Sequence, residues 1–299
     1  MKPDIYAYGM TCLSTIHVLD GDYPPPDTYR EIQRTYVLPS GEAGNAALLL
    51  AGFGLTVKLD GPVLGVRTRD AVLAFYTGHG IDCGGMAYDP EFAGVEDLVL
   101  VDGSTRTIFG RFAHYHGSGE NRWSAPDRKA IAAAHAVSLD HGFGAASMET
   151  AALCSASGTP YVTIDLPPDH EIHRRAAVSI LSPEYLNREF PGADHRALFD
   201  RYVANTDGLV IFTRGGENIR FARRNGEAGN FKPFRVEVKG SLAAGDFFRG
   251  GAVYAVSRRW PDKEIVAFST AVGALACARF PAALDPPRLD EALALAKLC

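Results

Sequence analysis

An aspartate that follows a run of small residues is the side chain in this sequence best suited to chemistry. Residues 241–246 read Ser-Leu-Ala-Ala-Gly-Asp and lead into a helical pattern. Backbone N–H groups at a helix start, with small side chains beside them, can bind an anion such as phosphate. Asp246 would then be placed to accept the proton of an attacking hydroxyl group. An acid in the first helical turn more often interacts only with the helix dipole, so both roles stay open.

A second glycine-containing segment predicts a different ligand. A strand at 137–140 is followed by Gly142-Phe143-Gly144, a helix, and a further strand that ends at Asp165. This order imitates a dinucleotide fingerprint, in which glycines approach the pyrophosphate and an acid binds the ribose. Because the third glycine of that fingerprint is missing, an NAD-dependent oxidoreductase remains a third-ranked hypothesis for the chain.

The histidines and cysteines do not show the spacings that metal sites need. His114 and His116 form one close pair and His170 and His173 another, but no acid or cysteine completes a ligand set near either. We therefore expect surface histidines. The five cysteines stand singly, without a Cys-x-x-Cys pair, so we expect buried reduced thiols rather than disulfides or structural zinc.

The elements that must position Asp246 form an alternating pattern. Short β-rich runs precede longer helical stretches along the chain, which is typical of an α/β sheet, and several runs are apolar throughout, as buried parallel strands are. We expect strands at 5–9, 56–60, 137–140, 161–165, 178–181 and 209–213, and helices at 44–51, 70–78, 245–258, 263–279 and 289–297.

Two segments interrupt this pattern. Residues 16–39, with three consecutive prolines, and residues 98–116, with alternating polar and apolar side chains, both favour extended structure. They are too short to make a domain. Such strands could form a small sheet that covers a site on the main body, or they could be ordinary surface hairpins.

Composition and charge exclude several classes of protein. Of the 299 residues 46% are hydrophobic and 22% charged, which is typical of folded globular proteins. The net charge of −5 and the lack of a Lys/Arg cluster argue against a nucleic-acid partner. The longest apolar stretches, at 46–55 and 271–278, are far shorter than the roughly 18 residues of a membrane span. Without a secretory signal pattern at the amino terminus, we expect a cytoplasmic protein with no membrane partner.

The chain resembles a known family in motifs that are spread along its length. Residues 241–246, followed by Phe and then Gly-Gly, resemble the Asp-Thr-x-Gly-Ala-Gly-Asp-x-Phe signature of the ribokinase (PfkB) family of carbohydrate and nucleoside kinases. Residues 40–47 are similar to its Gly-Gly-x-x-x-Asn-x-Ala signature. Thr-Arg-Gly-Gly at 213–216 resembles its nucleotide loop, and Gly-Ser-Thr-Arg-Thr at 103–107 its lid strand. The matching positions in the amino-terminal signature are Gly41, Asn45 and Ala47.

The resemblance implies a ribokinase-like α/β fold, with a central, mostly parallel sheet flanked by helices and a small β-sheet lid. The lid would comprise residues 16–40 and 98–116, and the core residues 1–15, 41–97 and 117–299. The implied reaction is ATP-dependent phosphorylation of a hydroxyl group on a small sugar or sugar-like substrate, with Mg²⁺ bound to the ATP.

The resemblance also implies a role for individual residues. The implied catalytic residues are Asp246 as general base and Ala243, Ala244 and Gly245 as the anion hole. The implied substrate contacts are Ser14, Gly41, Asn45 and Arg106. The implied ATP contacts are Thr213, Gly215, Gly216 and the strand-end acid Asp165, and Glu184 could reach Mg²⁺ through the bound ATP.

Several positions depart from the family pattern. Gly240 replaces an aspartate near a monovalent-cation site, which leaves potassium activation doubtful, and Ala243 replaces a glycine of the anion hole. Ser14 replaces an aspartate that holds sugar hydroxyls, and Ser182-Pro183-Glu184 stands where the family has Asn-x-x-Glu. A second hypothesis is therefore a kinase-like protein that binds its ligand but turns over poorly.

The first lid segment also suggests a partner. Residues 16–37 carry more apolar side chains than a small solvent-facing flap normally displays. Lid strands with exposed edges often pair with the lid of a second copy. We expect a homodimer formed through the lids, with Arg106 facing the substrate cleft; the alternative is a monomer whose lid folds onto its own body.

Overall fold

The computed structural model describes residues 2–103, 105–112, 115 and 122–298. Ser104, from the expected lid strand, and the pair His114 and His116 lie outside the described residues. No helix in the described part of the chain is long and apolar enough to cross a membrane.

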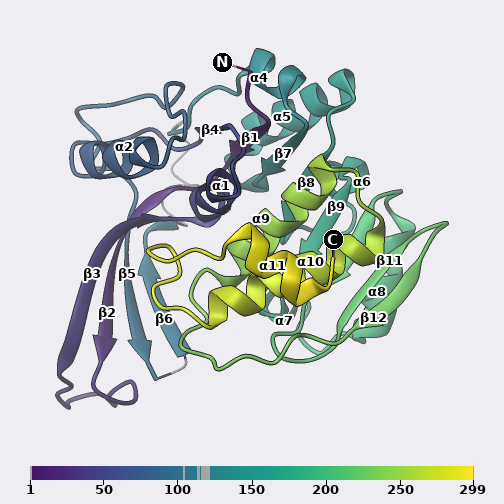
Figure 1. Ribbon diagram of the computed structural model, residues 1–299. Helices are drawn as coiled ribbons and strands as arrows, with labels where there is room; N and C mark the ends of the chain where they lie inside the picture. Colours follow the sequence, from purple (N-terminus) through teal and green to yellow (C-terminus); the bar gives the residue numbers. More distant parts are fainter. Residues whose placement is uncertain (1, 104, 113–114, 116–121, 299) are drawn as a thin grey trace.

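A large, mostly parallel sheet forms the centre of the molecule, as the sequence predicts. Among the described residues it has eight strands in the order β12-β11-β10-β9-β8-β7-β1-β4 (Figure 1). All neighbours pair in parallel except the antiparallel β10-β11-β12 meander at one edge. The strands are β1 (Ile5–Tyr8), β4 (Val57–Asp60), β7 (Ala136–Leu139), β8 (Tyr161–Ile164), β9 (Val178–Leu181), β10 (Leu209–Phe212), β11 (Ile219–Arg223) and β12 (Ala228–Phe231).

Helices cover both faces of this sheet because its strands are apolar on both sides. One face packs against α1 (Glu42–Gly52), α2 (Arg69–Gly78), α9 (Ala244–Ser257), α10 (Asp262–Cys277) and α11 (Leu289–Ala296). The other face packs against α4 (Arg128–Ala133), α5 (Gly144–Ser157), α6 (Glu171–Arg175), α7 (Pro183–Glu189) and α8 (His195–Ala204). In Figure 1 the yellow-green helices α9, α10 and α11 lie in front of the sheet.

Side-chain caps fix where several of these helices begin. Asp127 accepts hydrogen bonds from two backbone N–H groups at the start of α4, and Asp194 accepts one from the Arg196 N–H group at the start of α8. Ser182 caps α7, and Pro183 follows it in the first turn, where a missing N–H group costs nothing. Of these caps, Ser182 follows a strand of the large sheet directly, so the loop between β9 and α7 ends at a defined position.

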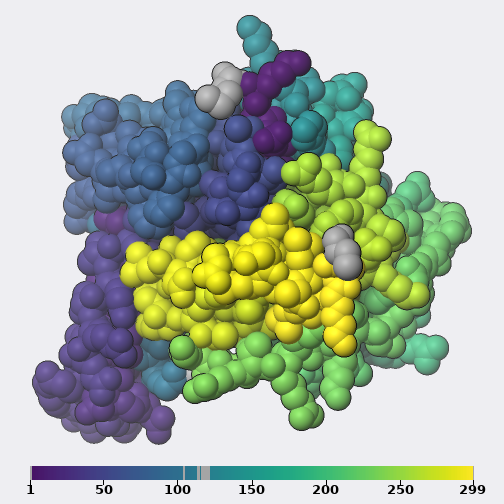
Figure 2. All heavy atoms as spheres, in the orientation of Figure 1, coloured from purple at the N-terminus to yellow at the C-terminus, as the bar shows by residue number. Residues whose placement is uncertain are grey.

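A separate four-stranded sheet, called the small sheet from here on, contains the two segments that interrupt the α/β pattern. Among the described residues its order is β3-β2-β5-β6, from β2 (Cys12–Leu19), β3 (Ile32–Ser40), β5 (Glu96–Asp102) and β6 (Thr105–Gly110). Ile16, Leu38 and Val99 pack its inner face against Leu48 of α1. Its far end projects from the body of the molecule at lower left in Figures 1 and 2. Strand β2 begins at Cys12, only a few residues after β1 ends, so the chain passes almost directly from the large sheet into the small sheet. The division of the chain into core and lid segments stays a prediction.

The expectation of surface histidines is wrong for His173. Its side chain is fully buried, with Nδ1 2.8 Å from Ser179 Oγ and Nε2 3.0 Å from the Tyr202 carbonyl oxygen. Both ring nitrogens have partners within the core, and burial lowers the pKa of His173. The short helix α6 places the side chain of His173 against β9. The spacing of histidines along the sequence, from which metal ligands are sought, does not reveal this contact. Among the described cysteines, Cys12, Cys83 and Cys154 are buried free thiols, as expected, whereas the free thiol of Cys277 is only half-buried; Cys299 lies outside the described residues.

Candidate active site

A cavity of about 500 Å³ lies between the core and the inner face of the small sheet. Its wall is formed by the carboxyl ends of β7, β8 and β9, the starts of α1 and α9, and strands β2, β5 and β6. The predicted site residues in its lining are Ser14, Gly41, Asn45, Arg106, Asp165, Glu184, Ala243, Gly245 and Asp246. Residues from distant parts of the sequence thus meet around one cavity.

Gly41 sets the start of α1 beside strand β2. Its φ of 101° lies in the region that favours glycine, and a Cβ atom would lie only 2.6 Å from the Met10 carbonyl oxygen. A side chain at this position would push α1 away from the chain at Met10. Helix α1 in turn presents Asn45, whose Nδ2 donates a hydrogen bond to Asp246 Oδ2 at 2.8 Å. The two signature motifs of the sequence therefore meet through their polar side chains.

The start of α9 offers an open backbone surface to the cavity. Ala243 adopts a left-handed conformation with φ 66° and ψ 2°, which costs a non-glycine residue about 1–2 kcal/mol. This turn brings Gly245 to the first turn of α9, where a Cβ atom would meet no other atom within 4 Å. The first N–H groups of a helix have no partner within the helix. An anion in the cavity can thus approach the backbone at Gly245 without obstruction.

Asp246 lies in the same turn, and its protonation is influenced by several neighbouring groups. Burial within the cavity wall raises the pKa of Asp246, while the hydrogen bond from Asn45 and the positive charge of Arg249 lower it. The nearby Asp140 raises it further. An elevated pKa makes a carboxylate a better proton acceptor, provided that it remains ionised at the working pH.

A buried arginine lies one helical turn beyond Asp246. Arg249 is fully buried and forms an ion pair with Asp140, whose other oxygen accepts a hydrogen bond from the Met10 N–H group at 2.6 Å. Nε and Nη2 of Arg249 donate to no described residue. Glu42, in the first turn of α1, also faces the cavity; burial and Asp140 raise its pKa, and Arg249 opposes this. Arg249 is therefore the cation beneath a group of cavity-lining carboxyl groups.

Asp165 joins the ends of two neighbouring strands. It has a φ of 50°, and its two carboxylate oxygens accept hydrogen bonds from the backbone N–H group and the hydroxyl group of Ser182, each at 2.7 Å. Burial raises the pKa of Asp165 to about 6. The serine that replaces the family asparagine thus has a structural role, because it holds Asp165 and caps α7.

Arg106 connects the small sheet with the core. Its guanidinium group donates to Glu184 Oε1 of α7 at 3.0 Å and to Ser241 Oγ at 3.2 Å. Arg106 lines the cavity, as does Glu184. The contact draws β6 towards the segment that leads into α9, so the small sheet covers the cavity.

The predicted nucleotide loop lies outside this lining. Thr213 follows β10, and both its N–H group and its hydroxyl group donate to the Leu181 carbonyl oxygen, at 3.0 and 3.2 Å. Gly215 has a φ of 58°, and Cβ atoms at Gly215 and Gly216 would meet nothing within 4 Å. A phosphate chain or a base could therefore lie against this backbone, at the same edge of the sheet as the cavity.

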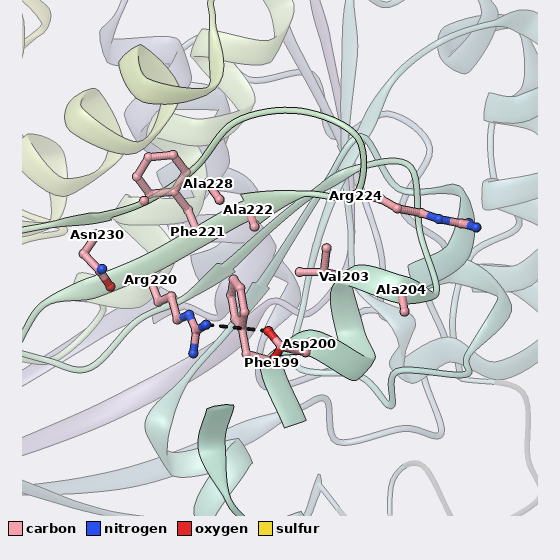
Figure 3. Close-up of a pocket in the computed structure, with 11 residues that line it drawn as sticks. Phe199, Asp200, Val203, Ala204, Arg220, Phe221, Ala222, Arg224, Ala228 and Asn230 are labelled. Atoms are coloured by element: carbon pink, nitrogen blue, oxygen red, sulfur yellow. Dashed lines mark ion pairs between the residues drawn. The ribbon is translucent and has the colours of Figure 1, made fainter. Parts of the chain in front are cut away.

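A second cavity is separate from the predicted residues. About 540 Å³ in volume, it lies between α8 and the β11-β12 hairpin (Figure 3). Arg220 pairs with Asp200 at 3.6 Å and lies over the ring of Phe199. None of the residues predicted for the site lines it.

The sequence interpretation missed several residues of the first cavity. Asp140 directly follows β7 as Asp165 directly follows β8, so the rule that singled out Asp165 would have found it. Arg249 is a charged residue within an otherwise apolar helical stretch, a pattern that indicates a buried ion pair. Asp97 and Cys12 depend on how the strands of the small sheet pair, which local patterns do not reveal.

Comparison with solved structures shows that the fold is shared with sugar and nucleoside kinases. The structure is similar to ribokinase from Arabidopsis thaliana, solved with ribose and ATP, with a TM-score of 0.81, 15% identity and 100% of both chains covered. It is similar to a nucleoside kinase from Methanocaldococcus jannaschii, with a TM-score of 0.78, 15% identity and 99% of each chain covered. For a fructokinase from Xylella fastidiosa with bound ATP, the values are 0.76, 20% and 99% of each chain. At these identities the likeness establishes the fold alone.

The sequence itself carries the family assignment. The family model described as pfkB family carbohydrate kinase matches residues 2–288. This span includes both signature motifs and every residue that lines the first cavity. Because the match extends over nearly the whole chain, we conclude that the protein belongs to the pfkB family of carbohydrate kinases, which are phosphotransferases.

Proposed function

We propose that this protein transfers the γ-phosphoryl group of ATP to a hydroxyl group of a small sugar or sugar-like substrate. The observation that carries the proposal is the pairing of Asp246 with open backbone at Gly245 in one cavity wall. Phosphoryl transfer needs a proton acceptor beside a site for the transferred anion, and these two features supply both.

In the proposed reaction, Asp246 accepts the proton of the sugar hydroxyl group. The hydroxyl oxygen then bonds to the γ-phosphorus as the bond to the bridging oxygen of ADP breaks. Asn45 orients the carboxylate through its hydrogen bond to Oδ2, and N–H groups around Gly245 stabilise the charge on the transferred group. The small sheet excludes water from the cavity during the step.

ATP, when bound with Mg²⁺, supplies the phosphoryl group. The open backbone at Gly215, Gly216 and Gly245 fits a phosphate chain, since Cβ atoms there would meet nothing. In the described part of the chain, no group of three or more His, Cys, Asp or Glu side chains is placed to hold a metal ion. The ATP phosphates would therefore hold most of the Mg²⁺ coordination, and Glu184, which is exposed and paired with Arg106, is placed to contribute through them.

The test is ADP release by purified protein with ATP, Mg²⁺ and a panel of D-ribose, D-fructose, D-glucose, D-gluconate and adenosine. We expect turnover with at least one sugar, and Asp246→Asn to lower it by on the order of 10² to 10⁴ while ATP binding and folding persist. Asp70→Asn is the matched control, because Asp70 is also an acid in a first helical turn but lies in α2. Near-normal turnover of Asp246→Asn would contradict the assignment of the base.

The second hypothesis, a kinase-like protein that binds but turns over poorly, is distinguished by the same panel. Its support is the left-handed Ala243 and the replacements at Ser14, Gly240 and Ser182. Thermal stabilisation by a sugar without ADP release would favour it. The NAD hypothesis conflicts with membership of a phosphotransferase family, and titration with NADH is expected to show no saturable binding.

We also propose that two copies associate through the small sheet. Its edge strand β3 and the loop before it expose large apolar side chains to solvent. These are Tyr23, Tyr29, Ile32 and Val37. Unpaired edge strands with exposed apolar residues are prone to pair with another chain, so this edge is the part of the molecule best suited to a homodimer contact.

A further inference from the structure

A carboxylate on the inner face of the small sheet lacks a partner for one of its oxygens. Asp97 of β5 lines the first cavity, and its Oδ2 is 3.6 Å from the donating Sγ of Cys12. Its Oδ1 is buried and accepts no hydrogen bond from any described residue. A buried acceptor of this kind costs stability unless another molecule supplies a donor. Because Asp97 lines this cavity, a ligand bound there is a candidate source of the missing donor.

Asp97 lies beside the serine that the sequence interpretation placed in the substrate site. Strands β2 and β5 pair in parallel, and their register sets Ser14 next to Asp97. Both residues line the cavity. Burial raises the pKa of Asp97, and the neighbouring side chains of Ser14 and Cys12 lower it. The pair therefore combines a hydroxyl group and a carboxyl group at one place on the cavity wall.

We propose that Asp97 binds a hydroxyl group of the sugar through its free Oδ1, with Ser14 as its neighbour in the same subsite. This inference rests on the proposed kinase function and assigns the sugar-binding carboxylate to the small sheet. A hydroxyl donor satisfies the buried oxygen, and the charge on the acceptor strengthens the bond. The sugar would then be contacted by Asp246 from α9 of the core and by Asp97 from β5 of the small sheet.

The charges around the cavity restrict the substrate class further. The carboxyl groups in its lining are those of Glu42, Asp97, Asp140, Asp165, Glu184 and Asp246. Arg106, the arginine in the described lining, is already paired with Glu184, and Arg249 beneath the wall is paired with Asp140. A carboxylate or phosphate on the substrate would meet like charge at the Asp97 subsite. The geometry therefore favours an uncharged polyhydroxyl substrate over a sugar acid or a sugar phosphate.

The experiment compares the Michaelis constant for the sugar between variants of neighbouring residues. With the sugar from the panel that turns over fastest, Asp97→Ala should raise the sugar KM about ten- to a hundredfold, with kcat within about threefold of wild type. The KM for ATP should not change. Glu96→Ala is the matched control, because Glu96 is the adjacent carboxylate on β5 but pairs with Arg67 outside the cavity. Asp97→Asn, which keeps the shape of the side chain, should show a smaller rise in the sugar KM.

An exchange of the two neighbours tests direct contact rather than general damage. The double variant Ser14→Asp, Asp97→Ser moves the carboxylate to the paired position of β2, and it should recover part of the sugar affinity that Asp97→Ser alone loses. Unfolding midpoints of all variants verify that they fold. An unchanged sugar KM in both Asp97→Ala and Asp97→Asn overturns the inference, as does faster turnover of D-gluconate than of the neutral sugars.

The failure of this inference is distinguishable from failure of the kinase proposal. If no member of the panel yields ADP with the wild-type protein, the kinase proposal fails, and thermal stabilisation by D-ribose and D-fructose becomes the readout for Asp97. Stabilisation of the wild type and of Glu96→Ala but not of Asp97→Ala supports the hydroxyl subsite. Equal stabilisation of wild type and Asp97→Ala, or stabilisation of neither, overturns it.

Discussion

Replacement of Gly245 by alanine is expected to make the protein more stable and less active. Gly245 lies in the first turn of α9, and its Cβ position is open, so the methyl group meets no protein atom. Alanine restricts the unfolded chain and favours the helix, which stabilises a protein by about 0.5–1 kcal/mol. In the proposed reaction, the same methyl group would occupy the space through which the transferred phosphoryl group approaches the backbone.

The magnitudes follow from chain length and contact distance. At about 2.1 cal/mol/K of unfolding entropy per residue, 299 residues convert 0.5–1 kcal/mol into a rise of about 1–2 °C in the unfolding midpoint. An N–H group binds a phosphoryl oxygen at about 2.9 Å, a distance that a neighbouring methyl group obstructs. Loss of one such donor commonly lowers kcat by on the order of 10² to 10³, and we expect a loss in that range.

Calorimetry and the ADP-release assay measure the two effects on the same samples. Gly78→Ala is the matched control, because Gly78 is also helical and its Cβ position is also open, but it ends α2 outside the cavity. It should raise the midpoint by a similar amount without changing turnover. If Gly245→Ala keeps turnover within about twofold of wild type, the start of α9 is not the anion hole.

Further predictions concern the charges, the strained turn and the assembly. Turnover should decline as the pH falls through the raised pKa of Asp246, because the protonated carboxyl group cannot accept a proton; a profile flat to pH 4 would contradict this. Arg249→Met should move that acidic limb to higher pH and cost about 3–5 kcal/mol of stability in urea unfolding, since Asp140 loses its partner; an unchanged profile would remove Arg249 from the electrostatics of the site. Ala243→Gly should stabilise the fold by about 0.5–1 kcal/mol in the same measurement by relieving the left-handed alanine, and a loss of stability would contradict that reading. Light scattering at low micromolar concentration should give the mass of a dimer, and a monomer mass would contradict the contact through the small sheet.

The sequence predicts those cavity residues that belong to short contiguous motifs. Gly41 and Asn45 belong to one motif and Gly245 and Asp246 to another, so short patterns identify them before their contact is known. The apolar strand runs predict the parallel sheet for the same reason, because strand burial is a local property of the sequence.

The residues that were missed depend on contacts between distant segments. Asp97 becomes a candidate substrate contact only when β5 pairs with β2, and Arg249 only when α9 packs beside the end of β7. His173 shows the converse: without further ligands at metal-site spacing it is expected at the surface, yet its partners Ser179 and Tyr202 come from other elements of the core. Local sequence patterns therefore do not identify residues whose role depends on contacts between distant segments.

The contact of Arg106 with Glu184 is a partly exposed ion pair, so its contribution to covering the cavity should depend on salt. Both side chains are partly exposed, and such pairs contribute about 0–1 kcal/mol, so the contact favours the closed arrangement without holding it shut. Mobile ions weaken attraction between exposed charges, with a screening length of about 8 Å at physiological ionic strength. A smaller closed fraction lowers the apparent affinity of any ligand that binds only the closed form. Sugar affinity should therefore weaken with ionic strength even for a substrate that carries no charge.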